Sequence, residues 1–460
     1  MSHINSVLKK KGYIVKKNEL TSSQIYKIKK QLKVRPFVNP QFAMQAKSFP
    51  VYLENTNKFY LPRYWGIKEF REPMKDKLSL GEEIDVSFVK ELRDYQKPIV
   101  NAMMVAAKEK GGGLICVGCG LGKTVISINI LSQLKRKTLV IVHKEFLMNQ
   151  WKDRINEFLD GARIGKIQGK TIDIHNKDIV IGMLQSISMK DYLPTVFESF
   201  GTVIFDECHH LGAEVFSKAL PKVASKYMIG LSATPKRSDG LTKVFEWYIG
   251  DIVYSSDKNQ SKKDDVNVRL IKYKNHSKDY GKEVLNYKGM VNIPRMITNI
   301  CSFEERSIFI IKIIKELVLE DRKILLLSDR RAQLNYFKEY LDSNNICSSG
   351  FYVGGMKQKE LKNSEEAQIL LATYSMASEG FDVPSLNTLI LASPKSSIEQ
   401  SIGRILRQRP ETRKKIPLVI DIVDNFSVFS RQGDKRRRYY KRNKYDISFE
   451  TSNDDTETTH

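Results

Sequence analysis

Short apolar runs alternate with helical patterns along most of the chain. Between residues 91 and 254 the runs are GLICV, TLVIV, DIVIGM, TVIFD and YMIGLS. Each run is rich in β-branched residues and too short for a buried helix, and each is followed by a polar or glycine-rich turn. Strands that alternate with helices in this way predict a parallel sheet covered by helices on both faces.

The same alternation returns in KILLLSD, AQILLAT, TLILAS and PLVIDIV, after the polar stretch SSDKNQSKKDD. That stretch is typical of a linker. The sequence therefore predicts an α/β protein with two tandem parallel-sheet domains, at residues 89–255 and 256–430.

The two ends of the chain differ from this pattern. In residues 1–88 a helical stretch, SSQIYKIKKQL, leads into alternating aromatic residues with prolines, so we expect a small α+β accessory domain there. Residues 431–460 are basic and then acidic, with few apolar positions. We expect a frayed tail in this last segment.

Charge favours a polyanionic partner. The 460 residues carry a formal net charge of +23, and the first fifty contain eleven Lys or Arg against one acid, Glu19. Clustered cations gain free energy by displacing the counterions of a phosphate backbone, although a plain basic protein is the alternative. The accessory domain is therefore expected to bind nucleic acid.

The sequence also indicates where the protein acts. The amino-terminal segment lacks the apolar core of a signal peptide, and no run approaches the ~18 apolar residues of a membrane span, so we expect an intracellular protein. Five cysteines are too few for a disulfide scaffold of this size. Cys116 and Cys119 form a C-x-x-C pair, but no second pair lies at metal-site spacing, which disfavours zinc or redox chemistry.

The stretch VGCGLGKT, residues 117–124, is a candidate phosphate-binding loop between a strand and a helix. Val117 stands where the full pattern has its first glycine, so a simple tight turn is the alternative. Glycines let backbone N–H groups approach a phosphate, and the following helix adds its positive end. Lys123 would reach the β- and γ-phosphates, and the Thr124 hydroxyl would bind Mg²⁺. The predicted nucleotide contacts in this loop are Gly118, Cys119, Gly120, Leu121, Gly122, Lys123 and Thr124.

The stretch TVIFDECHH places two acids at the carboxyl end of a predicted strand, where ligands of open α/β sheets bind. We assign Asp206 to Mg²⁺, through water, and Glu207 to the attacking water of phosphoanhydride hydrolysis. His209 and His210 lack partners at metal-ligand spacing, so a metal site on them is disfavoured.

GLGKT, DECH and LSATPKR, in this order, resemble the superfamily 2 helicases and translocases, whose phosphate loop commonly lacks the first glycine. The resemblance covers roughly residues 90–430. It implies two tandem RecA-like domains, with the small basic α+β accessory domain before them. It also implies ATP and Mg²⁺ as cofactors and a nucleic-acid-stimulated ATPase whose two domains open and close on one strand.

In the first domain the resemblance assigns further contacts. LRDYQ looks like the family's adenine-reading element, with Gln96 at the adenine edge and Arg93 nearby. LVIVHKEFLMNQW and GMLQS sit where the family contacts the nucleic-acid backbone. The residues concerned are His143, Lys144 and Ser186. The motif that links hydrolysis to strand movement is matched by Ser232 and Thr234.

In the second domain ATYSMASEGFDVP resembles the family's fifth motif. Thr373 would touch a phosphate of the bound strand, and Gly380 and Asp382 would lie at the interdomain cleft. QSIGRILR resembles the sixth motif, in which Gln400 would sense the nucleotide. Arg404 and Arg407 would stabilise charge on the transferring phosphoryl group, although their i, i+3 spacing also fits a solvated helix face.

The basic stretch KRRRYYKR would strengthen the binding of nucleic acid. Its Tyr439 and Tyr440 would stack on bases, with a simple charged tail as the alternative. Because backbone contacts carry no direct sequence information, we expect binding that is largely sequence-independent and weakens with salt.

CGLGKT, SATPKRSDG and VIDIVDNFSVF look most like the xeroderma pigmentosum B-type helicases and the related helicases of phages and large cytoplasmic DNA viruses. VRPFVNP resembles the amino-terminal segment of the poxvirus-type transcript-release helicases. The resemblance thus implies a monomeric viral DNA helicase linked to transcription, replication or repair, with viral transcription or replication proteins as partners, in host cytoplasm or virion. Three alternatives stay open: a duplex translocase that releases transcripts or proteins without unwinding, an RNA helicase, and a nucleic-acid-binding scaffold with an inactive ATPase.

Overall fold

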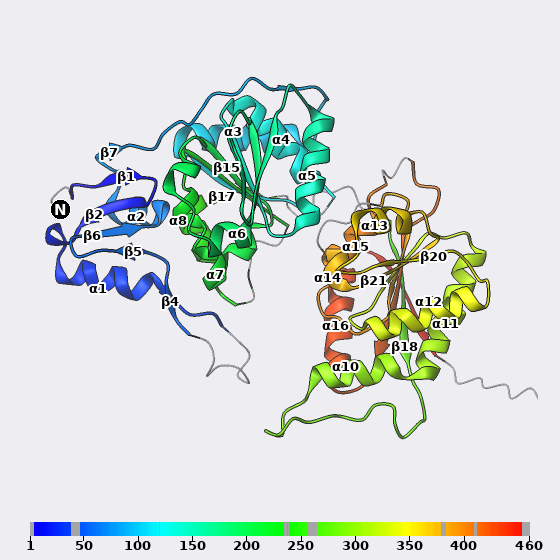
Figure 1. Cartoon of the computed structure of the whole chain (residues 1–460). Coiled ribbons are helices and arrows are strands. Elements are labelled where there is room, and N and C mark those ends of the chain that lie inside the picture. Colours follow the sequence, from blue (N-terminus) through cyan, green and yellow to red (C-terminus); the bar gives the residue numbers. More distant parts are fainter. Residues whose placement is uncertain are drawn as a thin grey trace, which may run out of the picture. The chain divides into compact units, whose positions relative to one another are not determined.

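The computed structural model describes residues 4–37, 47–118, 120–233, 237, 239–255, 265–378, 383–408 and 412–452 (Figure 1). The chain divides into two compact units, Met1–Ser256 and Asp257–His460. Among the helices of the described ranges, none combines the length and the apolar character that crossing a membrane requires.

The amino-terminal part of the first unit is α+β, as its pattern predicts. Its five-stranded sheet has the order β5-β6-β2-β1-β7. The strands are β1 (Val7–Lys9), β2 (Gly12–Lys16), β5 (Leu53–Glu54), β6 (Lys58–Leu61) and β7 (Lys75–Asp76). A separate antiparallel pair joins β3 (Lys33–Val34) to β4 (Phe49–Pro50). The helices are the 3-10 helix η1 (Lys17–Glu19), α1 (Ser22–Gln31) and α2 (Arg63–Phe70).

This amino-terminal part packs into the same unit as the sheet that follows it. Tyr13 and Trp65 belong to one buried hydrophobic cluster with Phe205 and Tyr248 of the following sheet domain. The Tyr248 hydroxyl also donates to the carbonyl of Val51 at 2.6 Å. The expected boundary at residue 88 therefore marks a change of composition inside one compact unit.

The first unit contains an eight-stranded sheet of order β13-β12-β14-β10-β15-β16-β9-β17. Neighbouring strands are parallel except β12 and β13. All five runs predicted as strands are confirmed. The bounds are β9 (Gly112–Cys116), β10 (Thr138–Val142), β12 (Ile164–Gln168), β13 (Thr171–Asp173), β14 (Ile179–Met183), β15 (Thr202–Phe205), β16 (Tyr227–Ser232) and β17 (Ile252–Ser255). A separate, short antiparallel pair joins β8 (Ser87–Phe88) to β11 (Leu159–Asp160).

Helices cover both faces of this sheet, which is why its strands read as continuous apolar runs. Successive residues of β9 point to opposite faces: Leu114 packs in one cluster and Ile115 in the other. The face of Ile115 carries α3 (Lys97–Lys110), α4 (Lys123–Leu134) and α5 (Glu145–Phe158). The opposite face carries α6 (Leu184–Met189), α8 (Leu220–Val223) and α9 (Thr242–Ile249). Three short helices complete the unit: η3 (Pro194–Phe197), η4 (Cys208–Gly212) and α7 (Glu214–Ser217).

The second unit is built on a seven-stranded parallel sheet of order β20-β21-β19-β22-β23-β18-β24. Its strands are β18 (Asn267–Tyr273), β19 (Ile324–Leu327), β20 (Ser349–Tyr352), β21 (Ile369–Ala372), β22 (Thr388–Leu391), β23 (Leu418–Asp424) and β24 (Asp446–Thr451). Its helices are α10 (Ile293–Ser302), α11 (Glu304–Leu319), α12 (Arg331–Ser343), α13 (Gln358–Glu365), α14 (Tyr374–Ser378), α15 (Glu399–Ile405) and α16 (Ser427–Arg442). The predicted α/β class with two tandem parallel-sheet domains is confirmed.

The expectation of a frayed tail from residue 431 is wrong for residues 431–452. Helix α16 covers the sheet, and β24 adds an edge strand beside β18. Tyr440 is fully buried and its hydroxyl donates to Asp421 at 2.8 Å, so it cannot stack on a base. Asp421 is also paired with the buried Arg436 at 2.7 Å. Asp421 on β23 thus pairs with two residues of the following helix α16, and composition alone does not reveal these pairs.

Candidate nucleotide site

The loop after β9 has a shape that requires glycine at its end. Gly122 caps α4 with a left-handed backbone, φ 77° and ψ 38°. A Cβ on Gly122 would lie 2.4 Å from Nε2 of Gln96. The backbone conformation therefore favours glycine, and a larger residue would also displace the side chain of Gln96. Gly120 also has a positive φ, 85°. Cys119 lies outside the described residues.

Gln96 braces this loop, so the stretch LRDYQ lies beside it. Its side chain is 3% exposed, and Nε2 donates to the carbonyl of Leu121 at 3.3 Å. Its Oε1 accepts a hydrogen bond from the backbone N–H of Arg93 at 3.0 Å. One amide hydrogen and one lone pair stay available for another partner. The exposed Arg93 guanidinium donates to the hydroxyl of Tyr95 at 3.0 Å.

The structure brings the predicted lysine and the predicted base together. Nζ of Lys123, the first residue of α4, lies 3.6 Å from Oε1 of Glu207. The two side chains are only 11% and 17% exposed, so the ion pair is weakly screened. Thr124 follows in the first turn of α4 and is half-buried.

Asp206, at the end of β15, is held by a residue that sequence reasoning missed. The indole Nε1 of the fully buried Trp151, on α5, donates to Asp206 Oδ2 at 2.9 Å. The backbone N–H of Glu207 donates to Oδ1 at 3.0 Å. The tryptophan lies in the helical stretch EFLMNQW, where its apolar neighbours make it look like an ordinary core residue.

The pKa values of the two adjacent carboxylates are shifted in opposite directions. Burial and the neighbouring Glu207 raise the pKa of Asp206, and the hydrogen bond from Trp151 opposes that rise. Burial also acts to raise the pKa of Glu207, but Lys123, followed by His209, outweighs it and the pKa is lowered. Glu207 is therefore the stronger candidate for an ionised base at neutral pH.

The backbone at Glu207 is strained. Its φ of 46° and ψ of 53° place a residue with a side chain in the left-handed region, at a cost of about 1–3 kcal/mol. In a regular strand, neighbouring side chains point to opposite faces. The turn at Glu207 instead lets both carboxylates lie near Lys123, and strain of this kind is common at functional sites.

Three histidines pack around the acidic pair. Nδ1 of His209 lies 3.1 Å from Oγ of Ser232 and 3.4 Å from Oε2 of Glu207, and burial lowers the pKa of His209. The ring of His210 lies between those of His209 and His143, with centroids 4.4 and 4.1 Å away.

His143 belongs to this histidine cluster, and its expected contact with a nucleic-acid backbone stays a prediction. Its side chain is 8% exposed and lies in the histidine cluster. Strands β10 and β15 are parallel neighbours in the sheet, so the residue that follows β10 falls beside the residues that follow β15. We therefore place His143 among the groups that surround Asp206 and Glu207.

Arg237 links the site to the amino-terminal part of the chain. Its guanidinium donates to the carbonyl of His209 and, through Nε, to Oδ1 of Asp239 at 2.8 Å. The backbone N–H of Phe37 donates to the carbonyl of Asp239 at 2.8 Å. Arg237 belongs to the motif LSATPKR, whose pattern alone predicts no role for this arginine. Thr234 of the same motif lies outside the described residues.

The other residues predicted to contact nucleic acid differ in their burial and in their hydrogen bonds within the fold. Lys144 is half-buried just before α5, and Thr373 is half-buried just after β21, with its hydroxyl 3.2 Å from that of Ser375. Ser186, on α6, is already used within the fold: its hydroxyl accepts from the backbone N–H of Gly169 at 2.9 Å.

The two arginines of the predicted sixth motif differ. Arg404 is 4% exposed, and its Nε donates to the carbonyl of Ala377 at 2.6 Å, which ties α15 to α14 within the second unit. This bond gives Arg404 a positioning role within the second unit, and its predicted contact with the nucleotide phosphate stays a prediction. Arg407 follows the end of α15 and is half-buried, as is Gln400. Gly380 and Asp382 lie outside the described residues.

Comparisons with known proteins identify the family of this chain. Residues 89–237 match the family described as "Type III restriction enzyme, res subunit", and residues 309–409 match "Helicase conserved C-terminal domain". The mimivirus protein "Putative ATP-dependent RNA helicase L396", from Acanthamoeba polyphaga mimivirus, is 38% identical over 458 residues, which cover 97% of this chain and 87% of that protein. The chain belongs to the superfamily 2 helicases.

Other relatives of this helicase also come from large DNA viruses. "Putative ATP-dependent RNA helicase QP509L" of African swine fever virus is 30% identical, over 71% of this chain and 68% of that protein. "Putative helicase 161L" of Invertebrate iridescent virus 6 is 28% identical, over 78% of this chain and 83% of that protein. The helicase is thus an ATP-using enzyme that binds nucleic acid, of the type found in large DNA viruses.

Proposed function

We propose that this helicase is a DNA-stimulated ATPase whose hydrolytic centre consists of Lys123, Asp206 and Glu207. The proposal is carried by the 3.6 Å approach of Lys123 to Glu207 below the glycine loop. In a simple strand-to-helix turn, a lysine at the start of the helix would extend into water, since burying a charge is costly. Here the chain keeps a cation and two acids together in a largely buried site.

The residues present suit a triphosphate with a divalent cation. Thr124 and Asp206 would hold Mg²⁺ through the hydroxyl and carboxylate oxygens that it prefers, and the ion would supply neutralisation of charge on the phosphates. Lys123 exchanges Glu207 for the terminal phosphates, and the freed Glu207 orients the attacking water and accepts its proton. The buried Trp151 keeps Asp206 in place during this exchange.

The second unit contributes the remaining groups in this proposal. Arg407 stabilises charge on the γ-phosphate, Gln400 senses the nucleotide, and the buried Arg404 positions both by fixing α15. Lys144 and Thr373, with Ser186 in support, contact the backbone of the bound strand.

DNA is our first candidate substrate, because CGLGKT and SATPKRSDG resemble the xeroderma pigmentosum B-type helicases. RNA is the second candidate, since the names of two relatives include the words "ATP-dependent RNA helicase". We further propose that the enzyme is monomeric, that it acts in viral transcription, replication or repair, and that it is located in the host cytoplasm or the virion.

The test measures phosphate release by wild type, Lys123→Ala and Glu207→Gln with single-stranded DNA, duplex DNA or RNA. We expect DNA to stimulate wild type most and both variants to be nearly inactive. Glu207→Gln should still bind ATP, because Lys123 and the loop are intact. Circular dichroism serves as the folding control.

Normal turnover in either folded variant would show that the substituted residue is not part of the hydrolytic centre. Stimulation by RNA alone would replace the DNA assignment with the RNA one. Strand separation on forked DNA, beside displacement of a triplex strand, then distinguishes unwinding from translocation on the duplex.

A further inference from the structure

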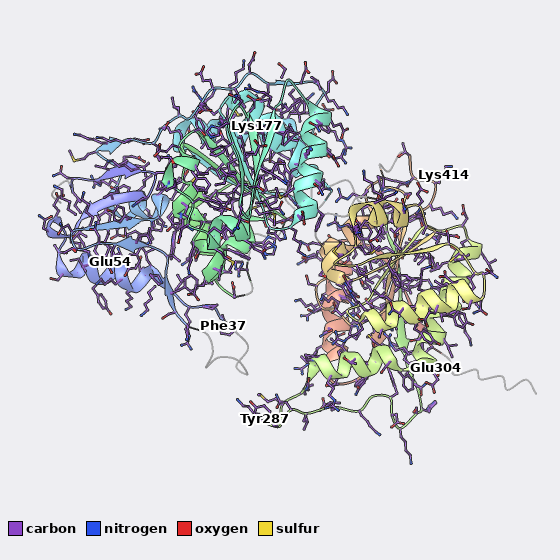
Figure 2. The ribbon with its side chains drawn as sticks, in the orientation of Figure 1. Phe37, Glu54, Lys177, Tyr287, Glu304 and Lys414 are labelled. Carbon is purple, nitrogen blue, oxygen red and sulfur yellow. The ribbon has the colours of Figure 1, made fainter. Side chains whose placement is uncertain are left out.

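The second unit carries a projecting hairpin between β18 and α10, at residues 283–292, with Tyr287 at its end (Figure 2). Leu285 and Val291 form an antiparallel bridge. On either side of this bridge, the N–H of Asn286 donates to the carbonyl of Met290 at 2.7 Å, and the N–H of Asn292 donates to the carbonyl of Val284 at 2.7 Å. The segment is therefore a paired structure and not a simple loop.

The tip of the hairpin is a built turn. Oδ1 of Asn286 accepts from the backbone N–H groups of Lys288 and Met290, at 2.9 and 3.1 Å. Gly289 has a φ of +72°, and its N–H donates to the carbonyl of Asn286 at 2.9 Å. A Cβ added at Gly289 would meet nothing within 4 Å, so the turn stands clear of the rest of the unit. The turn itself thus fixes the backbone that carries Tyr287.

The base of the hairpin is anchored at the start of α16. Val284 and Val291 pack against a small buried cluster on α10 and α16 that includes Met296 and Phe429. Just before the hairpin, the hydroxyl of Tyr280 donates to the buried Asp424 at 2.6 Å. Such anchoring lowers the entropy cost when the tip binds a partner.

The tip presents an aromatic ring among cations. Tyr287 is 92% exposed, and the ammonium of Lys288 lies 5.5 Å from the centre of its ring. Three further cations of the segment between β18 and α10 and the start of α10 are exposed: Lys274, Lys278 and Arg295. The two acids of the segment already have partners, since Asp279 pairs with Lys282 at 2.8 Å and Glu283 accepts from Ser427.

An exposed aromatic ring at the tip of an anchored hairpin, beside a cation, is suited to a base next to a phosphate, because every base offers a stacking face. We propose that Tyr287 stacks on a base of the bound nucleic acid while Lys288 pairs with the adjoining phosphate. The inference rests on the proposed function only in that the helicase binds nucleic acid. It adds a contact outside all the helicase motifs.

The test uses full-length protein and a single-stranded oligonucleotide that contains 2-aminopurine, whose fluorescence is quenched by stacking. We expect Tyr287→Ala to weaken binding about five- to hundred-fold, as for loss of one stacked base. The quenching should also be lost, and Tyr287→Phe should retain both. Leu319→Ala is the matched control, since Leu319 is 89% exposed on α11 of the same unit.

ATP hydrolysis without nucleic acid should be equal in all four proteins. Wild-type affinity in Tyr287→Ala would overturn the inference. Equal losses in the Ala and Phe variants would also overturn it, because the hydroxyl rather than the ring would then be responsible. If wild type shows no stimulation by any nucleic acid, the proposed function fails instead.

Discussion

Replacing Trp151 by Phe isolates one hydrogen bond at the hydrolytic centre. The change keeps an aromatic ring in the core but removes the N–H that donates to Asp206 at 2.9 Å. A hydrogen bond to a charged group contributes about 1.5–3 kcal/mol. If the whole amount supports the state in which Asp206 acts, ATP turnover falls about ten- to hundred-fold.

The same substitution should change the pH dependence of turnover. Burial and Glu207 raise the pKa of Asp206, and the Trp151 hydrogen bond opposes that rise by favouring the charged carboxylate. Without this bond the pKa rises further. Since only the ionised carboxylate can hold Mg²⁺, the rate declines as pH falls through the pKa. The acid limb of the profile should therefore move to higher pH in the variant.

The assay is DNA-stimulated phosphate release from mildly acidic to mildly alkaline pH, at saturating ATP. Trp247→Phe is the control, because Trp247 lies on α9 and packs at the opposite face of the sheet. Thermal unfolding shows whether either variant is destabilised. A folded Trp151→Phe enzyme with the wild-type rate and the wild-type acid limb would refute the role given to this hydrogen bond.

Two further predictions concern nucleotide contacts. Gly122→Ala puts a Cβ 2.4 Å from Gln96 Nε2 and costs about 1–2 kcal/mol in backbone energy, so binding of a fluorescent ATP analogue should weaken at least ten-fold. Gly240→Ala, also at φ +77° but with nothing within 4 Å, should bind normally, and equal effects would contradict the argument. Arg407→Ala should lower turnover about 10³-fold or more with ATP binding kept, whereas the exposed Lys414→Ala should match wild type. Loss of ATP binding alone would argue against a phosphate contact by Arg407.

Much of this helicase could be predicted from local pattern. Strands such as β9 and β15 are buried on both faces, so each reads as a short apolar run whatever its partners are. Lys123 and Glu207 could be assigned because each lies in a motif directly after its strand. Parallel strands present their carboxyl ends at one edge of a sheet, which brings such residues together.

The long-range contacts were decided by the tertiary structure. From the sequence Trp151 is an ordinary core residue, and only the fold shows that it donates to Asp206 after β15. His143 is expected at the surface, and only the pairing of β10 with β15 brings it beside the acidic pair. Arg404 and Tyr440 read as surface groups but find buried partners across the second unit.

The physical reason is the same in each case. Hydrophobic period and turn chemistry act over a few neighbouring residues, so the sequence by itself determined the elements, their order and the motif residues at their ends. Whether a polar side chain faces water or a buried partner depends on which distant segment the sheet order places beside it. Only the folded chain decided which polar motif residues are buried against partners within their own unit.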